Sequence, residues 1–174
     1  MKKLLAIILA SMFLYAGECL AMEIHSATFK NNAFLALEQA NARAGGADVS
    51  PDLQWQGIPA KAKSLALILH DPDAPHEHGW YHWIVVDIPA TVSGFAKGEK
   101  PSGGARELSG DADVIGYQGP CPPVGHGVHH YNFTIYALAD KPDLAAGMQP
   151  HEVEAVIKKN AIAQATMTGL YERK

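Results

Sequence analysis

Three apolar runs rich in β-branched and aromatic side chains constrain the fold of this chain more than any other feature. They span residues 65–69, 83–88 and 131–138, and clusters of Gly, Pro or Asp bound each of them. Short runs of this kind between turn-forming residues are typical of β-strands. The first run and the start of the second have apolar residues at consecutive positions, which predicts strands buried on both faces. We expect these strands to form the core.

Weaker candidates complete a β-rich pattern. Residues 24–29, 53–55 and 168–171 also have strand character. Short strands separated by regular turn signals predict a mainly β fold of two packed sheets. One segment has helical spacing instead: after Pro150, apolar residues recur on one face, with acids near the start and lysines near the end. We expect this helix to cover a sheet edge.

Two other segments are less regular. Residues 33–44 have a helix-forming composition that ends at a pair of glycines, which predicts a short helix. Residues 97–113 are polar and rich in Gly, and they are too long for a simple turn. We expect them to form a surface excursion that borders the functional site. The chain has 174 residues and no internal repeat, so we expect a single domain over residues 22–174.

The first 21 residues have the pattern of a secretory signal peptide. Lys2 and Lys3 precede a short apolar stretch over residues 4–14, and small residues lead to Ala21. The apolar stretch is too short for a comfortable membrane span. We therefore expect cleavage after Ala21 and a periplasmic or secreted protein that is not an integral membrane protein. An uncleaved anchor or core helix, and lipidation of Cys19, are the alternatives.

Charge and cysteine content restrict the partners and bonds of the mature chain. Cleavage removes two of the 14 basic and one of the 18 acidic side chains, which leaves a net charge of −5 with His neutral. No basic stripe favours binding to nucleic acid or to an anionic membrane surface. Cys19 leaves with the signal peptide, so Cys121 has no intramolecular disulfide partner. Stability must therefore come from the core.

Asp71 and His82 stand at the ends of two predicted strands and are candidate binding residues. Asp71 begins the run Asp-Pro-Asp-Ala-Pro, and the two prolines prevent the strand from continuing. One carboxylate is then expected to face a pocket, and an Asx-type turn made by both is the alternative. A nearby carboxylate would hold His82 protonated, as a partner for phosphate, whereas a structural role is the alternative. Trp80 would line the pocket mouth, and ordinary packing against neighbouring side chains is the alternative.

Residues 116–131 form a loop dense in Gly, Pro and His that leads into the third strand. Such a loop has little conformational freedom and is typical of a binding wall. Alternation along the strand directs His129 and Tyr131 to one face and His130 to the other. The sequence therefore predicts that His129 and Tyr131 line the pocket and donate hydrogen bonds to an anion. Backbone N–H groups of residues 119–121 would add donors, as anion-binding nests do.

Catalysis and metal binding are the alternatives for these polar residues. Cys121 could act as a nucleophile with a histidine and Asp71, but sequence spacing does not show the required contact. The mature chain has nine histidines, which include His76, His78 and His82. Yet no His-Glu-x-x-His helix, paired cysteine spacing, Gly-x-Ser-x-Gly elbow or Walker-type phosphate loop occurs. We therefore expect a binding protein without a metal or cofactor.

Three ordered motifs carry a resemblance to a known family. They are Asp-Pro-Asp-Ala-Pro at 71–75, Gly-Trp-Tyr-His-Trp at 79–83, and Gly-Tyr-x-Gly-Pro-Cys-Pro-Pro-x-Gly-x-Gly-x-His-x-Tyr at 116–131. With them the chain resembles the phosphatidylethanolamine-binding protein (PEBP) family, in particular its bacterial YbhB/YbcL branch, often labelled Raf-kinase-inhibitor-like. The likeness continues through residues 50–55 and the final helix, so it covers most of the mature chain.

The resemblance implies a mainly β fold of two antiparallel sheets with a few peripheral helices, and a small cavity that binds phosphate-like anions. Two departures stand out. His130 replaces the Arg common in the family, which questions a nearby salt bridge, and the chain ends soon after Tyr171, which predicts a more open site. The polar lining and backbone walls implied for the cavity comprise Asp71, Pro75, Trp80, His82, Gly119, Cys121, Pro122, Pro123, His129 and Tyr131.

These features lead to hypotheses of different classes. The first is an exported binding protein for phosphate or a phosphorylated head group such as phosphoethanolamine, with no catalysis. The second is a protein-interaction module, such as a protease inhibitor or a host-signalling modulator, in which the pocket and residues 97–113 contact a partner. Hydrolysis by Asp71, His82 and Cys121, or by a metal, is the third.

Overall fold

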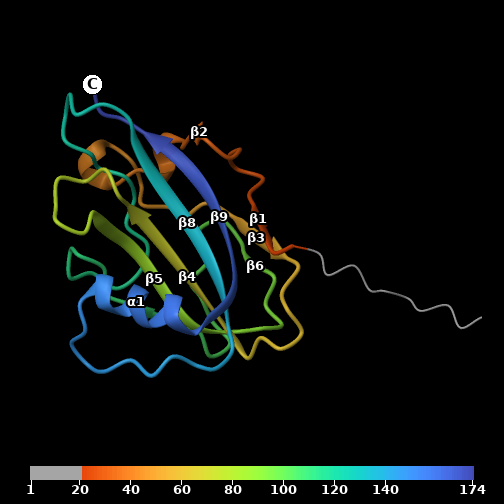
Figure 1. The fold of residues 1–174 in the computed structure, drawn as a ribbon. Helices are drawn as coiled ribbons and strands as arrows, with labels where there is room; N and C mark the ends of the chain where they lie inside the picture. Colours follow the sequence, from red (N-terminus) through yellow and green to blue (C-terminus); the bar gives the residue numbers. More distant parts are fainter. Residues whose placement is uncertain (1–20) are drawn as a thin grey trace, which may run out of the picture.

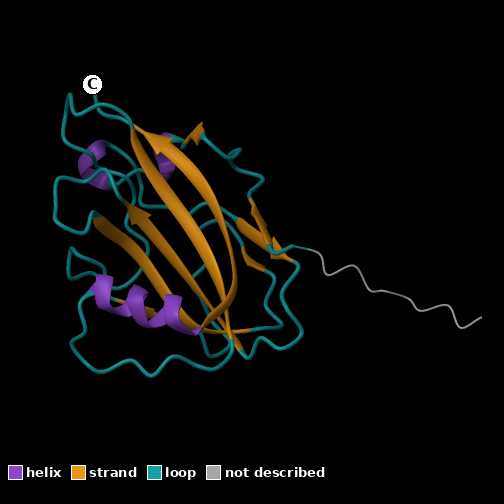
Figure 2. Cartoon of the chain, in the orientation of Figure 1, coloured by secondary structure: helices purple, strands orange, loops and turns teal. Residues whose placement is uncertain are grey.

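The computed structural model describes residues 21–174, which fold into two β-sheets with one α-helix packed on the larger sheet (Figure 1). Apart from Ala21, the predicted signal peptide lies outside the described residues. In the part of the chain that is described, no helix is both long and apolar enough to cross a membrane. Strands dominate the fold, and its helical segments lie at the periphery (Figure 2). The prediction of a mainly β, two-sheet fold is confirmed.

The two sheets differ in size. In spatial order, the small sheet consists of β1 (Glu23–His25), β3 (Leu53–Gln56) and β6 (Gly94–Phe95). In spatial order, the large sheet consists of β2 (Ala33–Phe34), β9 (Ala161–Tyr171), β8 (His129–Leu138), β4 (Ser64–Asp71), β5 (Trp80–Pro89) and β7 (Arg106–Leu108). Neighbouring strands are antiparallel except for β2 and β9, which are parallel.

The three predicted core strands are confirmed as β4, β5 and β8, and two weaker predictions need new bounds. The strand expected at 24–29 is shorter, because the Asp52 carboxylate accepts hydrogen bonds from the backbone N–H groups of Ala27 and Thr28 in place of a neighbouring strand. The strand expected at 168–171 is the end of the much longer β9. Its first half is rich in Ala, which gives a weak strand signal.

The central strand β4 contributes to a separate core on each face of the large sheet, as the consecutive apolar residues predicted. Leu65, Leu67 and Leu69 are fully buried in the cluster between the two sheets. Ala66 and Ile68 are buried in the cluster on the opposite face. This strand is thus held from both sides, and its last residues are a rigid base for a site.

The predicted helix after Pro150 is confirmed as α1 (Pro150–Asn160), with proline in its first turn. Its expected position at a sheet edge is wrong. Val153 and Ile157 pack into the cluster that contains Ala66 and Ile68 of β4, so the helix covers a face of the large sheet. The apolar stripe is the reason, because an edge would leave it partly in water.

The helix predicted over residues 33–44 is also wrong. This segment contains β2 and two 3₁₀ turns, η1 (Leu37–Gln39) and η2 (Ala42–Ala44). Asn41 interrupts it, since its side-chain oxygen accepts a hydrogen bond from Arg43 N and starts a new turn. The excursion over residues 97–113 includes β7, which pairs with β5 and forms one edge of the large sheet.

Candidate functional site

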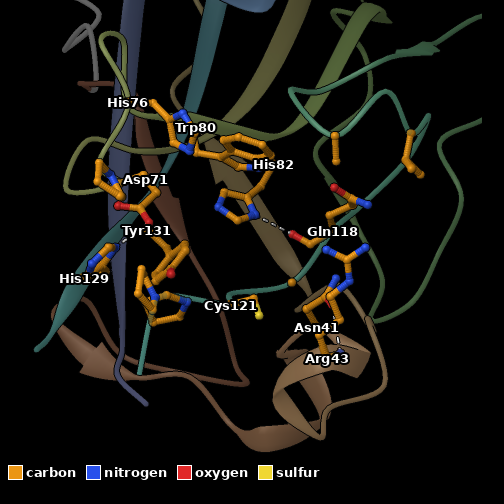
Figure 3. A pocket seen from close by; sticks show the side chains of 17 residues that line it. Asn41, Arg43, Asp71, His76, Trp80, His82, Gln118, Cys121, His129 and Tyr131 are labelled. Atoms are coloured by element: carbon orange, nitrogen blue, oxygen red, sulfur yellow. Dashed lines mark hydrogen bonds and ion pairs between the residues drawn. The ribbon is translucent and has the colours of Figure 1, made fainter. Parts of the chain in front are cut away.

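The predicted site residues come together because the strands that carry them are antiparallel. The end of β4 lies beside the start of β5, where Asp71 pairs with Trp80. The same end of β4 lies beside the start of β8, where His70 pairs with Asn132. Sequence segments about fifty residues apart therefore meet at one end of the large sheet, where they line a cavity of about 320 Å³ (Figure 3).

All ten residues that the resemblance implies line this cavity. In Figure 3, Asp71 and His129 lie on the left and Asn41 and Arg43 on the right, with Tyr131, His82 and Cys121 between them. The role of these residues in binding stays a prediction. The cavity lining also includes residues that are not among the ten implied by the resemblance, namely Asn41, Arg43, Ala74, His76, Ala112, Val114 and Gln118.

A β-bulge directs His82 into the cavity. The pairing between β4 and β5 joins Leu69 to Trp83 and His70 to Tyr81, so His82 is an extra residue opposite this step. Tyr81 belongs to the core on the α1 side, whereas the His82 ring packs edge-on against Tyr131, with 5.3 Å between the ring centroids. Bulges re-aim side chains in this way beside functional sites. Strict alternation from Trp83 would instead have placed His82 on the face opposite to Tyr131.

Asp71, His129 and His126 form a chain of hydrogen bonds. Asp71 Oδ2 lies 2.7 Å from His129 Nδ1, and His129 Nε2 lies 2.7 Å from His126 Nδ1. The other Asp71 oxygen accepts from the Asp73 backbone N–H at 2.9 Å. Both nitrogens of His129 are therefore already bonded. In this arrangement His129 holds Asp71 in place and has no ring nitrogen left for an anion, so its expected donation to an anion stays a prediction.

His82 is neutral at pH 7, contrary to the prediction of a protonated imidazole. Burial lowers its pKa to about 4, and the negative charge of Asp71 opposes this shift without cancelling it. His82 Nδ1 lies 3.1 Å from the backbone oxygen of Gln118. A carbonyl oxygen only accepts, so Nδ1 carries the proton and Nε2 has a free lone pair.

Tyr131 contributes a hydroxyl group that has no hydrogen-bond partner within the described residues. The side chain is fully buried, at 0% exposed. Burial raises the pKa of its phenol, and the nearby Asp71 carboxylate adds to that rise through its charge and a weak hydrogen-bond interaction, although no acceptor in the described part of the chain lies at full hydrogen-bonding distance from the hydroxyl. The hydroxyl is thus a protonated donor at neutral pH. Buried polar groups without a partner are rare in folded proteins, and one that lines a cavity points to a ligand.

The Gly-Pro-rich wall is rigid, but it does not form the predicted nest of amides. Gly119 approaches the backbone so closely that a Cβ atom there would lie 2.1 Å from Gln39 O, which only glycine avoids. Its N–H donates to Asp48 Oδ1 at 2.8 Å. Residues 120, 122 and 123 are prolines without an N–H. Cys121 is then the one residue of this wall in the described structure with an amide left for a ligand.

The half-buried thiol of Cys121 lies in the same wall. Arg173 Nη1 donates to its sulfur at 3.5 Å and to the Pro122 oxygen at 3.3 Å. No histidine hydrogen-bonds to the sulfur among residues 21–174. The same residues contain no group of three or more His, Cys, Asp or Glu side chains that converge as metal ligands.

His130 forms its own hydrogen bonds with Asp73 outside the cavity. Its ring Nδ1 lies 2.7 Å from Asp73 Oδ2, and its backbone N–H donates to the same oxygen at 2.8 Å. Burial alone would raise the pKa of Asp73, but these bonds lower it. His130, at the position where the resemblance implies an Arg, therefore provides a polar link between the start of β8 and the Asp-Pro loop. The predicted opposite orientations of His129 and His130 are confirmed, since His129 is buried and His130 exposed.

The fold and this cavity define a protein of the PEBP class. The sequence model of the phosphatidylethanolamine-binding protein family matches residues 25–172, and the chain belongs to this family. It is 34% identical to YbcL of Escherichia coli K12, a UPF0098 protein, over the full length of both chains. It is 40% identical to a UPF0098 protein of Methanothermobacter thermautotrophicus, over 74% of this chain and 85% of the relative.

Solved structures agree with the sequence relationship. The crystal structure of Escherichia coli YbcL, described as a member of the mammalian PEBP family, matches with a TM-score of 0.83 at 35% identity, over 89% of this chain and 100% of that one. A PEBP homologue from Chlamydia trachomatis matches with a TM-score of 0.77 at 33% identity, over 88% of this chain and 99% of that one. The predicted family and fold are therefore confirmed.

Proposed function

We propose that this chain is a binding protein for a small phosphorylated anion, such as phosphate or phosphoethanolamine, and that it acts without catalysis. The observation that carries the proposal is the buried Tyr131 hydroxyl, which lines the cavity and has no partner within the described residues. An unpaired buried hydroxyl costs about 1–3 kcal/mol, a cost that a ligand oxygen would remove. The name of the family, which refers to a phosphate-containing lipid, supports this class of ligand.

Three groups would contact the anion. The Tyr131 hydroxyl and the Cys121 backbone N–H would each donate a hydrogen bond to a phosphate oxygen. His82 presents an unprotonated Nε2, because its Nδ1 proton is directed at the Gln118 oxygen. A phosphate that still carries one proton would donate it to this nitrogen. A fully ionised phosphate would bind only after His82 takes up a proton.

The protonation state of His82 gives the proposal a pH dependence. The pKa of His82 is near 4 in the protein without ligand, so binding of a phosphate dianion requires a proton that the imidazole does not hold at pH 7. Phosphate monoesters change near pH 6 from the dianion to the monoanion, which carries one proton. Both effects have the same sign, so the affinity for the anion rises as the pH falls from 7 towards 5.

The remaining polar residues would position these contacts. Asp71 is held by the Asp73 amide and by His129, and His129 is held in turn by His126. The cavity volume of about 320 Å³ is at the lower end for small-molecule sites. It suits a head group, while the acyl chains of a lipid would remain outside. We also propose export to the periplasm or medium, on the basis of the pattern at residues 1–21.

Calorimetric titration of the mature protein, residues 22–174, with phosphate and with phosphoethanolamine tests the proposal. We expect saturable binding by the wild type and loss of binding in His82→Ala. The matched control is His25→Ala, which removes an exposed histidine on β1 that does not line the cavity. Saturable binding that His82→Ala leaves unchanged would contradict the proposed site.

Folding of the variant must be separated from loss of binding. His82→Leu keeps most of the buried volume, so it provides a second variant if His82→Ala unfolds. Circular dichroism and urea unfolding of each variant establish that the fold is intact before titration. If neither ligand binds to the folded wild type, the anion-binding proposal fails, and a protein partner becomes the better hypothesis.

A further inference from the structure

We propose that Arg43 makes the cavity selective for ligands that carry a carboxylate in addition to the phosphate. Phosphorylated amino acids such as phosphoserine would then bind more tightly than phosphoethanolamine. This inference rests on the proposed function, because it concerns the second charged group of the same ligand. Sequence analysis gave no sign of Arg43, which lies in a segment predicted to be helical and far in sequence from the site motifs.

The charges around the cavity are separated. Asp71 and its partner His129 lie on one side, and Arg43 lies on the other (Figure 3). His82 and Tyr131, the groups that would bind the phosphate, are neutral at pH 7 and lie between the two sides. Of the described residues that line the cavity, Arg43 is the one Lys or Arg. A second anionic group on the ligand would find its complement there.

The guanidinium of Arg43 differs from those of the other two arginines. Arg106 Nε forms an ion pair with Asp87 at 2.6 Å, and Arg173 donates to the Cys121 sulfur and the Pro122 oxygen. Arg43 makes a hydrogen bond through its backbone N–H, whereas its guanidinium has no partner within residues 21–174. A planar cation that lines a cavity with all of its donors free suits a carboxylate, which it can bind with two parallel hydrogen bonds.

The segment that carries Arg43 is fixed to the cavity wall. Asn41 N donates to Pro120 O at 3.0 Å, and the Asn41 side chain accepts from Arg43 N at 3.0 Å. Asp48 Oδ1 links this segment to the wall, since it accepts hydrogen bonds from Asn41 Nδ2 at 3.0 Å and from Gly119 N at 2.8 Å. The backbone of Arg43 is therefore held in register with the wall that contains Cys121. This rigidity favours recognition of a charge at a defined distance from the phosphate.

Phosphoserine and phosphoethanolamine form a matched pair of probes, because they differ only by the α-carboxylate. We expect the wild type to bind phosphoserine about fivefold more tightly, which is the upper end of the effect of one ion pair at an exposed arginine. Arg43→Gln should remove this preference and leave the affinity for phosphoethanolamine nearly unchanged. Lys61→Gln is the matched control, since Lys61 is exposed before the start of β4, at the end opposite to Asp71.

The outcomes separate this inference from the proposed function. A preference for phosphoserine that Arg43→Gln abolishes and Lys61→Gln preserves supports the role of Arg43. Equal binding of the two probes by the wild type, or a preference that survives in Arg43→Gln, overturns the inference while the proposed function stands. Binding of neither probe overturns both.

The source of such a head group is distinguished by a second arm of the experiment. Co-sedimentation uses phosphatidylcholine vesicles that contain either phosphatidylserine or phosphatidylethanolamine. Binding to phosphatidylserine vesicles that Arg43→Gln weakens and soluble phosphoserine displaces supports a lipid source. Binding of soluble phosphoserine without vesicle binding supports a free metabolite. Vesicle binding that Arg43→Gln does not change overturns a role for Arg43 in head-group selection.

Discussion

The two faces of the large sheet each hold a cluster of buried polar groups, and among the described residues one cluster has all of its hydrogen bonds while the other does not. On the α1 side, the Glu154 carboxylate accepts from the Tyr81 hydroxyl at 2.7 Å and from the Tyr136 hydroxyl at 2.9 Å. On the cavity side, the Tyr131 hydroxyl has no partner within the described residues. Complete buried networks stabilise a fold. The incomplete one is where we propose that a ligand binds.

The pKa shifts of the two clusters follow from this difference. Burial alone would raise the pKa of Glu154, but hydrogen bonds from Tyr81, Lys158 and Tyr136 lower it below its usual value. Burial lowers the pKa of His82, and the Asp71 charge does not compensate. Glu154 is therefore a buried charge whose oxygens accept hydrogen bonds from donors of the protein itself. His82 is a base whose charged form still lacks a partner.

Removal of the Glu154 carboxylate should have the largest effect on stability. Glu154→Ala leaves the buried hydroxyls of Tyr81 and Tyr136 without an acceptor, so we expect the free energy of unfolding to fall by about 3 kcal/mol. Urea unfolding followed by circular dichroism measures the change. Glu23→Ala, which removes an exposed carboxylate from β1, is the control and should change little. A loss below about 1 kcal/mol in Glu154→Ala would contradict a stabilising role for this network.

The pH dependence of stability should separate the two clusters. The pKa of His82 is about 6.5 in the unfolded chain and about 4 in the folded one, so the unfolded state binds more protons between these values. Stability should therefore fall as the pH drops from 6.5 to 4, by up to about 3 kcal/mol for this group. The contribution of Glu154 is instead present above its unfolded value of 4.5 and is lost as the pH falls through its lower folded pKa.

Urea unfolding across this pH range, with His82→Leu beside the wild type, measures the contribution of His82 to stability between pH 6.5 and 4. The variant should show a flatter dependence between pH 6.5 and 4, and the same loss of stability as the wild type at lower pH. Saturating phosphate should also flatten the wild-type curve, because the proposed ligand favours protonated His82. An identical slope in wild type and variant would mean that His82 does not titrate as its burial predicts.

The smallest expected effect concerns Lys158, at the exposed end of the hydrogen-bond network around Glu154. Lys158 Nζ lies 2.9 Å from Glu154 Oε2, but the lysine side chain is 55% exposed. Ion pairs of this kind contribute little, so Lys158→Gln should lower the free energy of unfolding by less than about 0.5 kcal/mol. The same urea unfolding experiment, at low and high salt, measures this difference. A loss comparable to that of Glu154→Ala would show that charge pairing, and not the tyrosine hydroxyls, dominates the cluster.

The sequence predicted the core and most of the cavity, because both follow from local signals. Apolar runs identified β4, β5 and β8, and turn residues at their ends placed Asp71, His129 and Tyr131 at the same end of the sheet. The sequence could not predict how these groups bond to one another. Whether His129 retains a free nitrogen depends on the position of His126, which is a matter of loop conformation.

Other features depended on tertiary contacts that leave no local pattern. The bulge at His82 follows from the register between two strands, and the charge state of this imidazole follows from its burial. Arg43 lies in a segment whose composition suggested a helix, and Asp48 and Pro120 fix that segment to the cavity wall. Propensity was overridden there by pairing of the preceding residues with β9.

Tyr131→Phe, assayed for both stability and binding, tests the central claim most directly. The hydroxyl has no partner within the described residues, so its removal should leave the free energy of unfolding unchanged or slightly higher. The affinity for phosphoethanolamine should fall about tenfold, while Tyr171→Phe, outside the cavity lining, should change neither property. Loss of stability together with unchanged affinity would show that the hydroxyl serves the fold and would contradict the account.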